Sequence, residues 1–99
     1  MTEQELSITV RLSCQRALLG AITPNVRLVT IGWDGLKLFK LKVYFATEPS
    51  EDEIDDFNVV STEVISDIPF ENDQVECIFS DAPKSQLAVY NHIVYLRKE

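Results

Sequence analysis

The sequence predicts an α+β fold in which two helices pack on one face of a four-stranded, mainly antiparallel sheet. Three observations support this prediction. Apolar residues recur at the helical period in two separate segments, and a capping box opens each of them. Two strand-like segments are joined by Asp34-Gly35, a dipeptide that favours a tight hairpin turn. The expected order is α-β-β-α-β-β within a single domain, residues 1–99.

The first helix is predicted to begin at Thr2 and Glu5, whose side chains can each bond the other's free backbone amide. One set of apolar residues recurs at the 3.6-residue period and is expected to be buried: Leu6, Val10, Cys14, and Ala17 or Leu18. Three further residues are expected to widen the same face: Ile8, Leu12 and Leu19. Gly20 and Pro24 are expected to end the helix and the loop after it.

Residues 26–33 and 36–45 are predicted to form a hairpin with Asp34-Gly35 as its two-residue turn, so that Trp33 faces Leu36. The face expected beneath the helices carries Val26, Leu28, Thr30, Phe39, Leu41, Val43 and Phe45. The opposite face then carries Val29, Ile31, Trp33, Leu36 and Leu38. An apolar outer face favours a partner-binding or dimer surface. The alternatives are that a loop or the C-terminal segment covers this face, or that the register differs by one residue.

A second helix is predicted after Pro49, with Ser50 and Glu53 as its capping box and Pro69 at its end. Its inner stripe is expected to carry Ile54, Phe57, Ser61, Val64 and Ile65. Two more strands, 74–80 and 87–97, are expected to form a second antiparallel hairpin. How the two hairpins join in the sheet is left open.

Charge is divided unevenly along the chain. Residues 1–47 carry six basic and three acidic side chains, whereas residues 48–99 carry three basic and thirteen acidic ones. The negative half is expected to attract a cationic partner and to repel nucleic acid. The residues expected to meet that partner are Glu48, Glu51, Asp52, Asp55 and Asp56.

The sequence offers little for catalysis. His92 is the single histidine, and a set with Glu63 or Asp81 would be the only acid–base group to test. No Gly-x-Ser-x-Gly elbow occurs, and the acidic run lacks the glycine that a calcium loop of the EF-hand type requires. We therefore expect no catalytic residues, no metal and no cofactor.

Localisation is predicted from the N-terminus and the cysteines. The segment Met1-Thr2-Glu3-Gln4-Glu5 is polar and acidic, unlike a signal peptide, and no apolar run is long enough to span a membrane. Cys14 and Cys77 lack metal-binding or redox spacing and are expected to be reduced core residues. These features favour a cytoplasmic protein without membrane partners.

Several stretches resemble a family of short bacterial proteins of unassigned function. They are Cys14 to Asn25, Glu48 to Glu53, Thr62 to Asp67 and Val94 to Glu99. The resemblance covers most of the chain but carries no motif of known chemistry. In size and charge the chain is also similar to small acidic bacterial immunity proteins, which neutralise cationic toxins; this likeness is a fold-level analogy.

These observations give a leading interpretation and two alternatives. The leading one is a non-catalytic protein-binding domain, in its most concrete form an immunity-type inhibitor of a cationic toxin. The first alternative is a structural homodimer or subunit built on the outer face of the first hairpin. The second alternative is a small enzyme.

Overall fold

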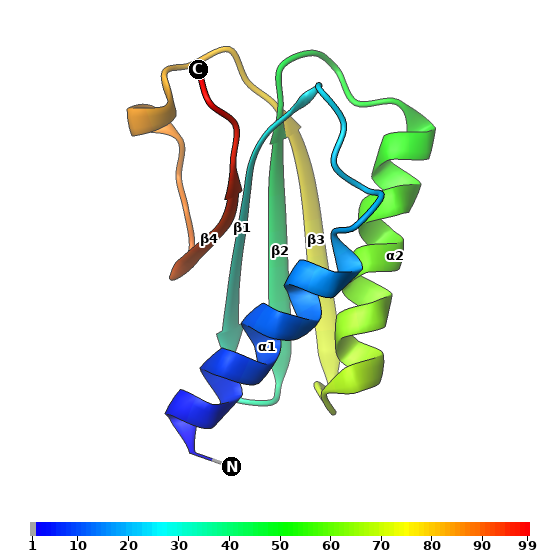
Figure 1. Ribbon diagram of the computed structural model, residues 1–99, viewed down its shortest axis with the longest axis vertical. Helices are drawn as coiled ribbons and strands as arrows, with labels where there is room; N and C mark the ends of the chain where they lie inside the picture. The colour runs from blue at the N-terminus through cyan, green and yellow to red at the C-terminus, as the bar shows by residue number, and fades with distance from the viewer. Residues whose placement is uncertain (1) are drawn as a thin grey trace.

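A computed structural model describes residues 2–99. The described chain contains two α-helices, four strands and one short 3₁₀ helix: α1 Glu3–Ala17, β1 Val26–Asp34, β2 Leu38–Phe45, α2 Glu51–Asp67, β3 Asn72–Phe79, η1 Lys84–Gln86 and β4 His92–Leu96. The strands form one sheet in the order β3-β2-β1-β4. Both helices lie on the same face of that sheet (Figure 1). The predicted α+β class and element order are therefore confirmed.

Both helices begin where the sequence predicted. The Thr2 hydroxyl accepts from the Glu5 amide at 3.1 Å, and the Ser50 hydroxyl accepts from the Glu53 amide at 3.1 Å. In each helix the glutamate carboxylate accepts a hydrogen bond from the backbone amide of the capping residue, which completes the capping box. The two boxes satisfy backbone amides that a helix start otherwise leaves free.

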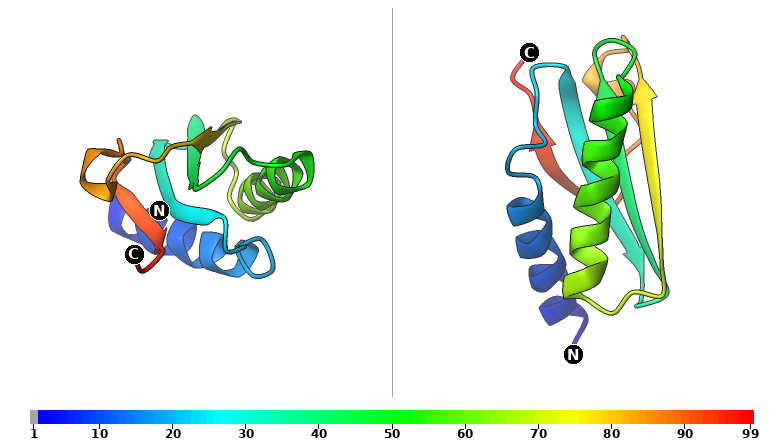
Figure 2. Two further views of the ribbon diagram at one scale, coloured as in Figure 1. Left: turned by 90° about the horizontal axis from the view of Figure 1, so that it is seen from above. Right: turned by 90° about the vertical axis from the view of Figure 1, so that its right-hand side faces the viewer.

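The second predicted hairpin is wrong. Strands β3 and β4 lie at opposite edges of the sheet; β3 pairs with β2 in parallel, and β4 pairs antiparallel with β1. The physical reason is that α2 carries the chain back along the sheet, so that β3 restarts in the direction of β2. Residues 80–91 then cross the sheet on the side away from α1, as the left view of Figure 2 shows.

The register of the first hairpin also differs from the prediction. Three residues, 35–37, form the loop, so that Asp34 pairs with Leu38 and Trp33 with Phe39. Gly35 adopts φ 53°, a left-handed conformation that favours glycine, and the Lys37 amide donates to the Asp34 carbonyl at 3.0 Å. From Leu28 to Trp33, each β1 residue therefore pairs three positions further along β2 than predicted, and Val26, beyond the irregularity, pairs two positions further. An odd shift exchanges the faces of one strand relative to the other.

The predicted outer apolar face does not exist as such. Val29 and Ile31 are 0 % exposed and lie beneath the helices, opposite Val43 and Leu41. Trp33 is half-buried against the same core, Leu38 is half-buried, and Leu36 is exposed in the turn. The register does differ from the prediction, as one alternative proposed, but by three residues instead of one. Leu28 and Thr30, predicted to lie beneath the helices, belong to the opposite face.

The opposite face of the sheet is covered by residues 80–91. Leu28, Tyr44 and Leu87 form a second buried cluster there, and the Tyr44 hydroxyl donates to the Ala88 carbonyl at 2.7 Å. A Cβ at Gly32 would lie 3.0 Å from the Tyr90 Cβ, so the glycine permits this close approach. A loop thus covers one face of the sheet, but that face carries Leu28 and Tyr44 and is not the face that the alternative placed under a loop.

The last strand is held by an ion-pair network around Arg27, which stands at the irregularity in the β1–β2 pairing. Arg27 is buried, and its Nε and Nη2 donate to the Glu99 carboxylate at 2.8 and 3.0 Å. Its Nη1 donates to the Ser80 carbonyl at 2.7 Å. The hydrogen bonds from Arg27 hold the pKa of Glu99 at about 2, with Arg97 contributing further. This network connects β1, the β3–β4 connection and the end of the chain.

Ile31→Ala is expected to lower the free energy of unfolding by about 3 kcal/mol, since it leaves a cavity between the sheet and the helices. Urea denaturation measures the change. The control Leu36→Ala removes an exposed side chain and is expected to change stability by less than about 0.5 kcal/mol. Equal effects from the two variants would contradict the observed register.

Candidate protein-binding surface

The described residues contain no arrangement typical of an active site. Within residues 2–99, no group of three His, Cys, Asp or Glu side chains is placed to hold a metal ion. The His92 ring stacks on Trp33 with 5.0 Å between ring centroids, and across this part of the chain its nitrogens form no ion pair with a carboxylate. The structure therefore does not bring His92 together with Glu63 or Asp81 as a hydrogen-bonded set.

The hollow beside the C-terminal segment, about 440 Å³ in volume, is lined in part by Arg27, Arg97 and Lys98. This basic corner is not an open anion site, because Glu99 already accepts from both arginines. Arg97 Nη1 donates to the Pro24 carbonyl at 2.8 Å. Lys84 nearby donates to the Arg97 carbonyl at 2.8 Å. The hydrogen bonds of this basic corner therefore hold the C-terminal segment against the rest of the fold.

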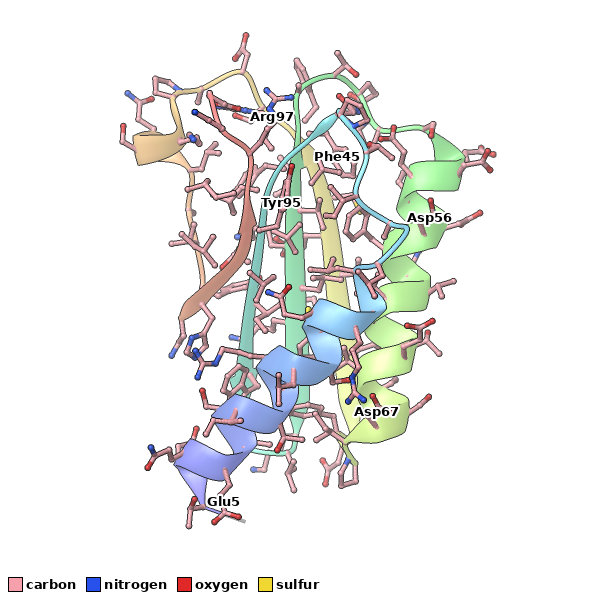
Figure 3. All side chains as sticks on the ribbon, viewed as in Figure 1. Glu5, Phe45, Asp56, Asp67, Tyr95 and Arg97 are labelled. Atoms are coloured by element: carbon pink, nitrogen blue, oxygen red, sulfur yellow. The ribbon has the colours of Figure 1, made fainter. Side chains whose placement is uncertain are left out.

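The predicted acidic cluster forms one exposed surface at the start of α2 and in the loop before it. Its members are Glu48, Glu51, Asp52, Asp55 and Asp56, and every one is exposed. The three ion pairs found in residues 2–99 are Arg27–Glu99, Lys42–Glu76 and Arg97–Glu99, so none uses this cluster. Figure 3 shows Asp56 on the solvent side of α2. The helix dipole favours acids in the first turn, and their carboxylates remain open to a partner.

Glu53 lies within the same run and has a different environment. One carboxylate oxygen accepts from the Ser50 amide at 3.1 Å, and the other accepts from the Thr23 hydroxyl at 3.0 Å. The Asn25 amide group adds longer bonds. The hydrogen bond from the Ser50 backbone is the main cause that lowers the pKa of Glu53, while partial burial acts in the opposite direction. Glu53 thus has a structural role and differs from the five cluster residues.

Asn25 fixes the loop that carries the cluster. Its side-chain oxygen accepts from the Thr47 amide at 2.8 Å and from the Thr47 hydroxyl at 2.9 Å. Its backbone carbonyl accepts from the Ala46 amide at 2.8 Å. Together with the bonds of Glu53, these bonds connect the loop after α1 to the loop before α2. They fix the position of the segment that carries the acidic cluster.

The two helices contact each other through polar groups as well as through the core. Ser13 is buried, and its hydroxyl donates to Asp67 at 2.7 Å (Figure 3 labels Asp67). Arg16 and Glu63 line the same shallow hollow between the helices. α1 is therefore set in a fixed position beside α2, which makes the outer sides of the two helices parts of one surface.

The expectation that Ile8, Leu12 and Leu19 widen the buried face of α1 is wrong. These side chains are 46, 59 and 82 % exposed. The reason is the helical period: Ile8 and Leu12 lie about half a turn from the buried stripe of Leu6 and Val10. Val59 on α2, 55 % exposed, was not singled out by the sequence analysis. At 100° per residue, Ile8 and Leu12 fall opposite the buried stripe of α1, and Val59 falls opposite the buried stripe of α2.

Comparison with known families and proteins complements this geometry. The chain is an α+β domain whose second helix begins with exposed carboxylates. Residues 7–99 match the family described as MafI2 immunity protein, and the chain belongs to this family. A comparison with curated proteins gave no match.

The family agrees with the predicted likeness to small immunity proteins. The family description also implies a toxin as the partner.

Neither helix of residues 2–99 combines the length and hydrophobicity needed to cross a bilayer.

Glu53→Gln is expected to lower the free energy of unfolding at pH 7 by about 1 kcal/mol, the size of a typical capping interaction. Because the folded pKa is depressed, the wild-type advantage is complete above the unfolded value near 4.3 and is lost as the pH falls through the folded value. Urea denaturation of the wild type and the variant at pH 7 and at pH 3 measures the difference in their free energies of unfolding at each pH. The exposed Glu51→Gln is the control, with a smaller expected effect. A Glu53→Gln deficit as large at pH 3 as at pH 7 would exclude this assignment.

Proposed function

We propose that this protein is an immunity-type inhibitor that binds a toxin by non-covalent contact, without catalysis, and that the toxin surface it meets is basic. The observation that carries the proposal is the family match over residues 7–99. The acidic cluster adds the chemistry of the partner, because its five exposed carboxylates have no cation of their own in the part of the chain described by the structure.

The charge of the chain supports a basic partner and disfavours nucleic acid. The formal net charge is −7, and the second half of the chain supplies the negative excess. A concentrated field of one sign accelerates the encounter with a partner of the opposite sign and repels a polyanion. Fast capture suits an inhibitor that must reach its toxin before damage occurs. We further propose that this capture takes place in the cytoplasm.

The homodimer alternative has lost the observation on which it depended. Its interface was to be the outer face of the first hairpin, but Val29 and Ile31 belong to the core. A symmetric pair through these residues would require the helices to leave the sheet. We therefore retain the toxin-binding proposal alone.

A toxin reading frame directly upstream of this chain's gene would favour the proposal, and the product of such a frame provides the test. Co-expression of the chain is expected to restore growth of cells that produce this toxin. A chain that folds normally and yet neither protects the cells nor binds the purified toxin would refute the proposed function.

The charge component has its own test. A variant with Glu51→Gln, Asp52→Asn, Asp55→Asn and Asp56→Asn is expected to associate with the toxin about tenfold more slowly at low salt, and added salt should narrow the difference. Stopped-flow fluorescence measures the association rate. The control Asp34→Asn with Glu71→Gln changes exposed carboxylates outside the cluster and should retain most of the rate. Because the cluster variant removes four charges and the control removes two, slowing in proportion to the number of charges removed would mean that only net charge matters.

A further inference from the structure

The outer surface of the helix layer carries an apolar strip, defined here as Ile8, Leu12, Leu19 and Val59. Leu19 is 82 % exposed, the largest exposure among the large exposed apolar side chains of residues 2–99. Isolated exposed apolar residues are common, whereas a set gathered on one surface favours a contact site. Ile8 and Leu12 are four residues apart on the outer side of α1, and Leu19 lies in the turn just after this helix, which ends at Ala17.

The fold does not account for this strip. The opposite side of α1 already supplies the core with Leu6, Val10 and Cys14, and these are at most 6 % exposed. The exposed side of α1 nevertheless carries two apolar side chains, Ile8 and Leu12, among polar and charged ones. A surface helix that only covers a sheet needs an apolar inner side and is usually polar outside.

Two shallow hollows join the strip into one surface. Leu12 and Leu19, with Gln15 and Arg16, line a hollow of about 510 Å³. Leu19 and Val59 also line a second hollow, of about 190 Å³, between the end of α1 and the outer side of α2. Leu19 belongs to both hollows and so links the two helices.

Carboxylates border the strip on the α2 side. Asp56 and Glu63 line the second hollow together with Leu19 and Val59, and both are exposed. Asp56 is also a member of the acidic cluster, so that the strip continues directly into the negatively charged surface. An apolar centre with a charged rim is the usual composition of a protein interface.

We propose that the apolar strip is the docking site for the toxin, and that the toxin inserts apolar side chains between Leu12, Leu19 and Val59 while its lysines or arginines meet Asp56 and Glu63. This inference rests on the proposed function and adds the place and chemistry of binding. The acidic cluster governs the rate of encounter, and the strip provides the contact that persists afterwards.

A second copy of the chain fits this surface less well than a basic protein. A two-fold pair centred on the strip would gather Asp56 and Glu63 from both copies around one interface. Like charges brought together in an interface oppose association. Charge complementarity thus selects a cationic partner.

Other exposed apolar residues provide a matched control. Ile93 and Leu96 on β4 are 49 and 51 % exposed, close to the values of Ile8 and Leu12. Basic Arg97 and Lys98 follow them in the chain, instead of a set of carboxylates. Truncation of these two partly exposed apolar side chains at β4 is therefore expected to leave toxin binding unchanged.

The test compares Leu12→Ala with Leu19→Ala, made together, against the control Ile93→Ala with Leu96→Ala. Alanine at position 12 favours the helix, and Leu19 is an exposed residue of the turn after it, so the Leu12/Leu19 variant is expected to fold. Isothermal titration with the purified upstream toxin measures Kd. We expect the strip variant to raise Kd at least about tenfold and the β4 variant to change it less than twofold. Circular dichroism and urea denaturation of each variant confirm that it is folded.

The outcomes separate this inference from the proposed function. If the wild-type chain binds and neutralises the toxin but the strip variant binds equally well, the docking site is wrong and the inhibitor function stands. If the wild-type chain does not bind at all, the proposed function fails first. Sedimentation of the wild-type chain provides the other check: a dimer that dissociates on Leu12→Ala with Leu19→Ala would assign the strip to a second copy.

Discussion

The fold depends on a central pair of strands that must be covered on both faces. In β1, seven consecutive residues from Val26 to Gly32 are buried, so neither side of this strand can face water. The helices cover one face, and the segment 80–91 covers the other. Thr30 shows how a polar group is accommodated there, since its hydroxyl donates to the His92 carbonyl at 2.7 Å and accepts from the Tyr90 amide at 3.0 Å. The chain therefore needs every element after β2 to complete this enclosure.

Local chemistry made the helices predictable, and non-local pairing made the sheet harder to predict. Both capping boxes lie within four residues of sequence, so Thr2 with Glu5 and Ser50 with Glu53 could be identified directly. The turn at Asp34-Gly35 was recognised, but its length was not, because Asp-Gly also suits a three-residue loop. That difference moved Val29 and Ile31 from a predicted outer face into the core. The pairing of β4 with β1 depends on contacts across the molecule, such as Arg27 with Glu99, for which no sequence pattern exists.

The candidate surface was predicted only in its charged part. Carboxylates at the start of a helix are exposed almost by necessity, so Glu51 and Asp55 could be placed outside from sequence alone. The apolar part was not predicted, because the hydrophobicity of Leu12 and Leu19 predicts that they are buried, whereas both are exposed. The helical period contains the correction, since a residue two positions from a buried one faces away from it. At the candidate binding surface, apolar side chains are exposed, so hydrophobicity does not predict burial there.

The connection between opposite edges of the sheet has a consequence for the order of events during synthesis. The bonds that fix β4 join residues far apart in the chain, with a separation of 62 for Thr30 to His92 and 72 for Arg27 to Glu99. Contacts of such long range form late, because a large loop must close before they are made. Until then Arg27 lacks the carboxylate that compensates its burial, and the inner side of β1 stays partly open. A chain in which these late contacts have not yet formed therefore leaves β1 open, and locally open segments are the ones that proteases cleave.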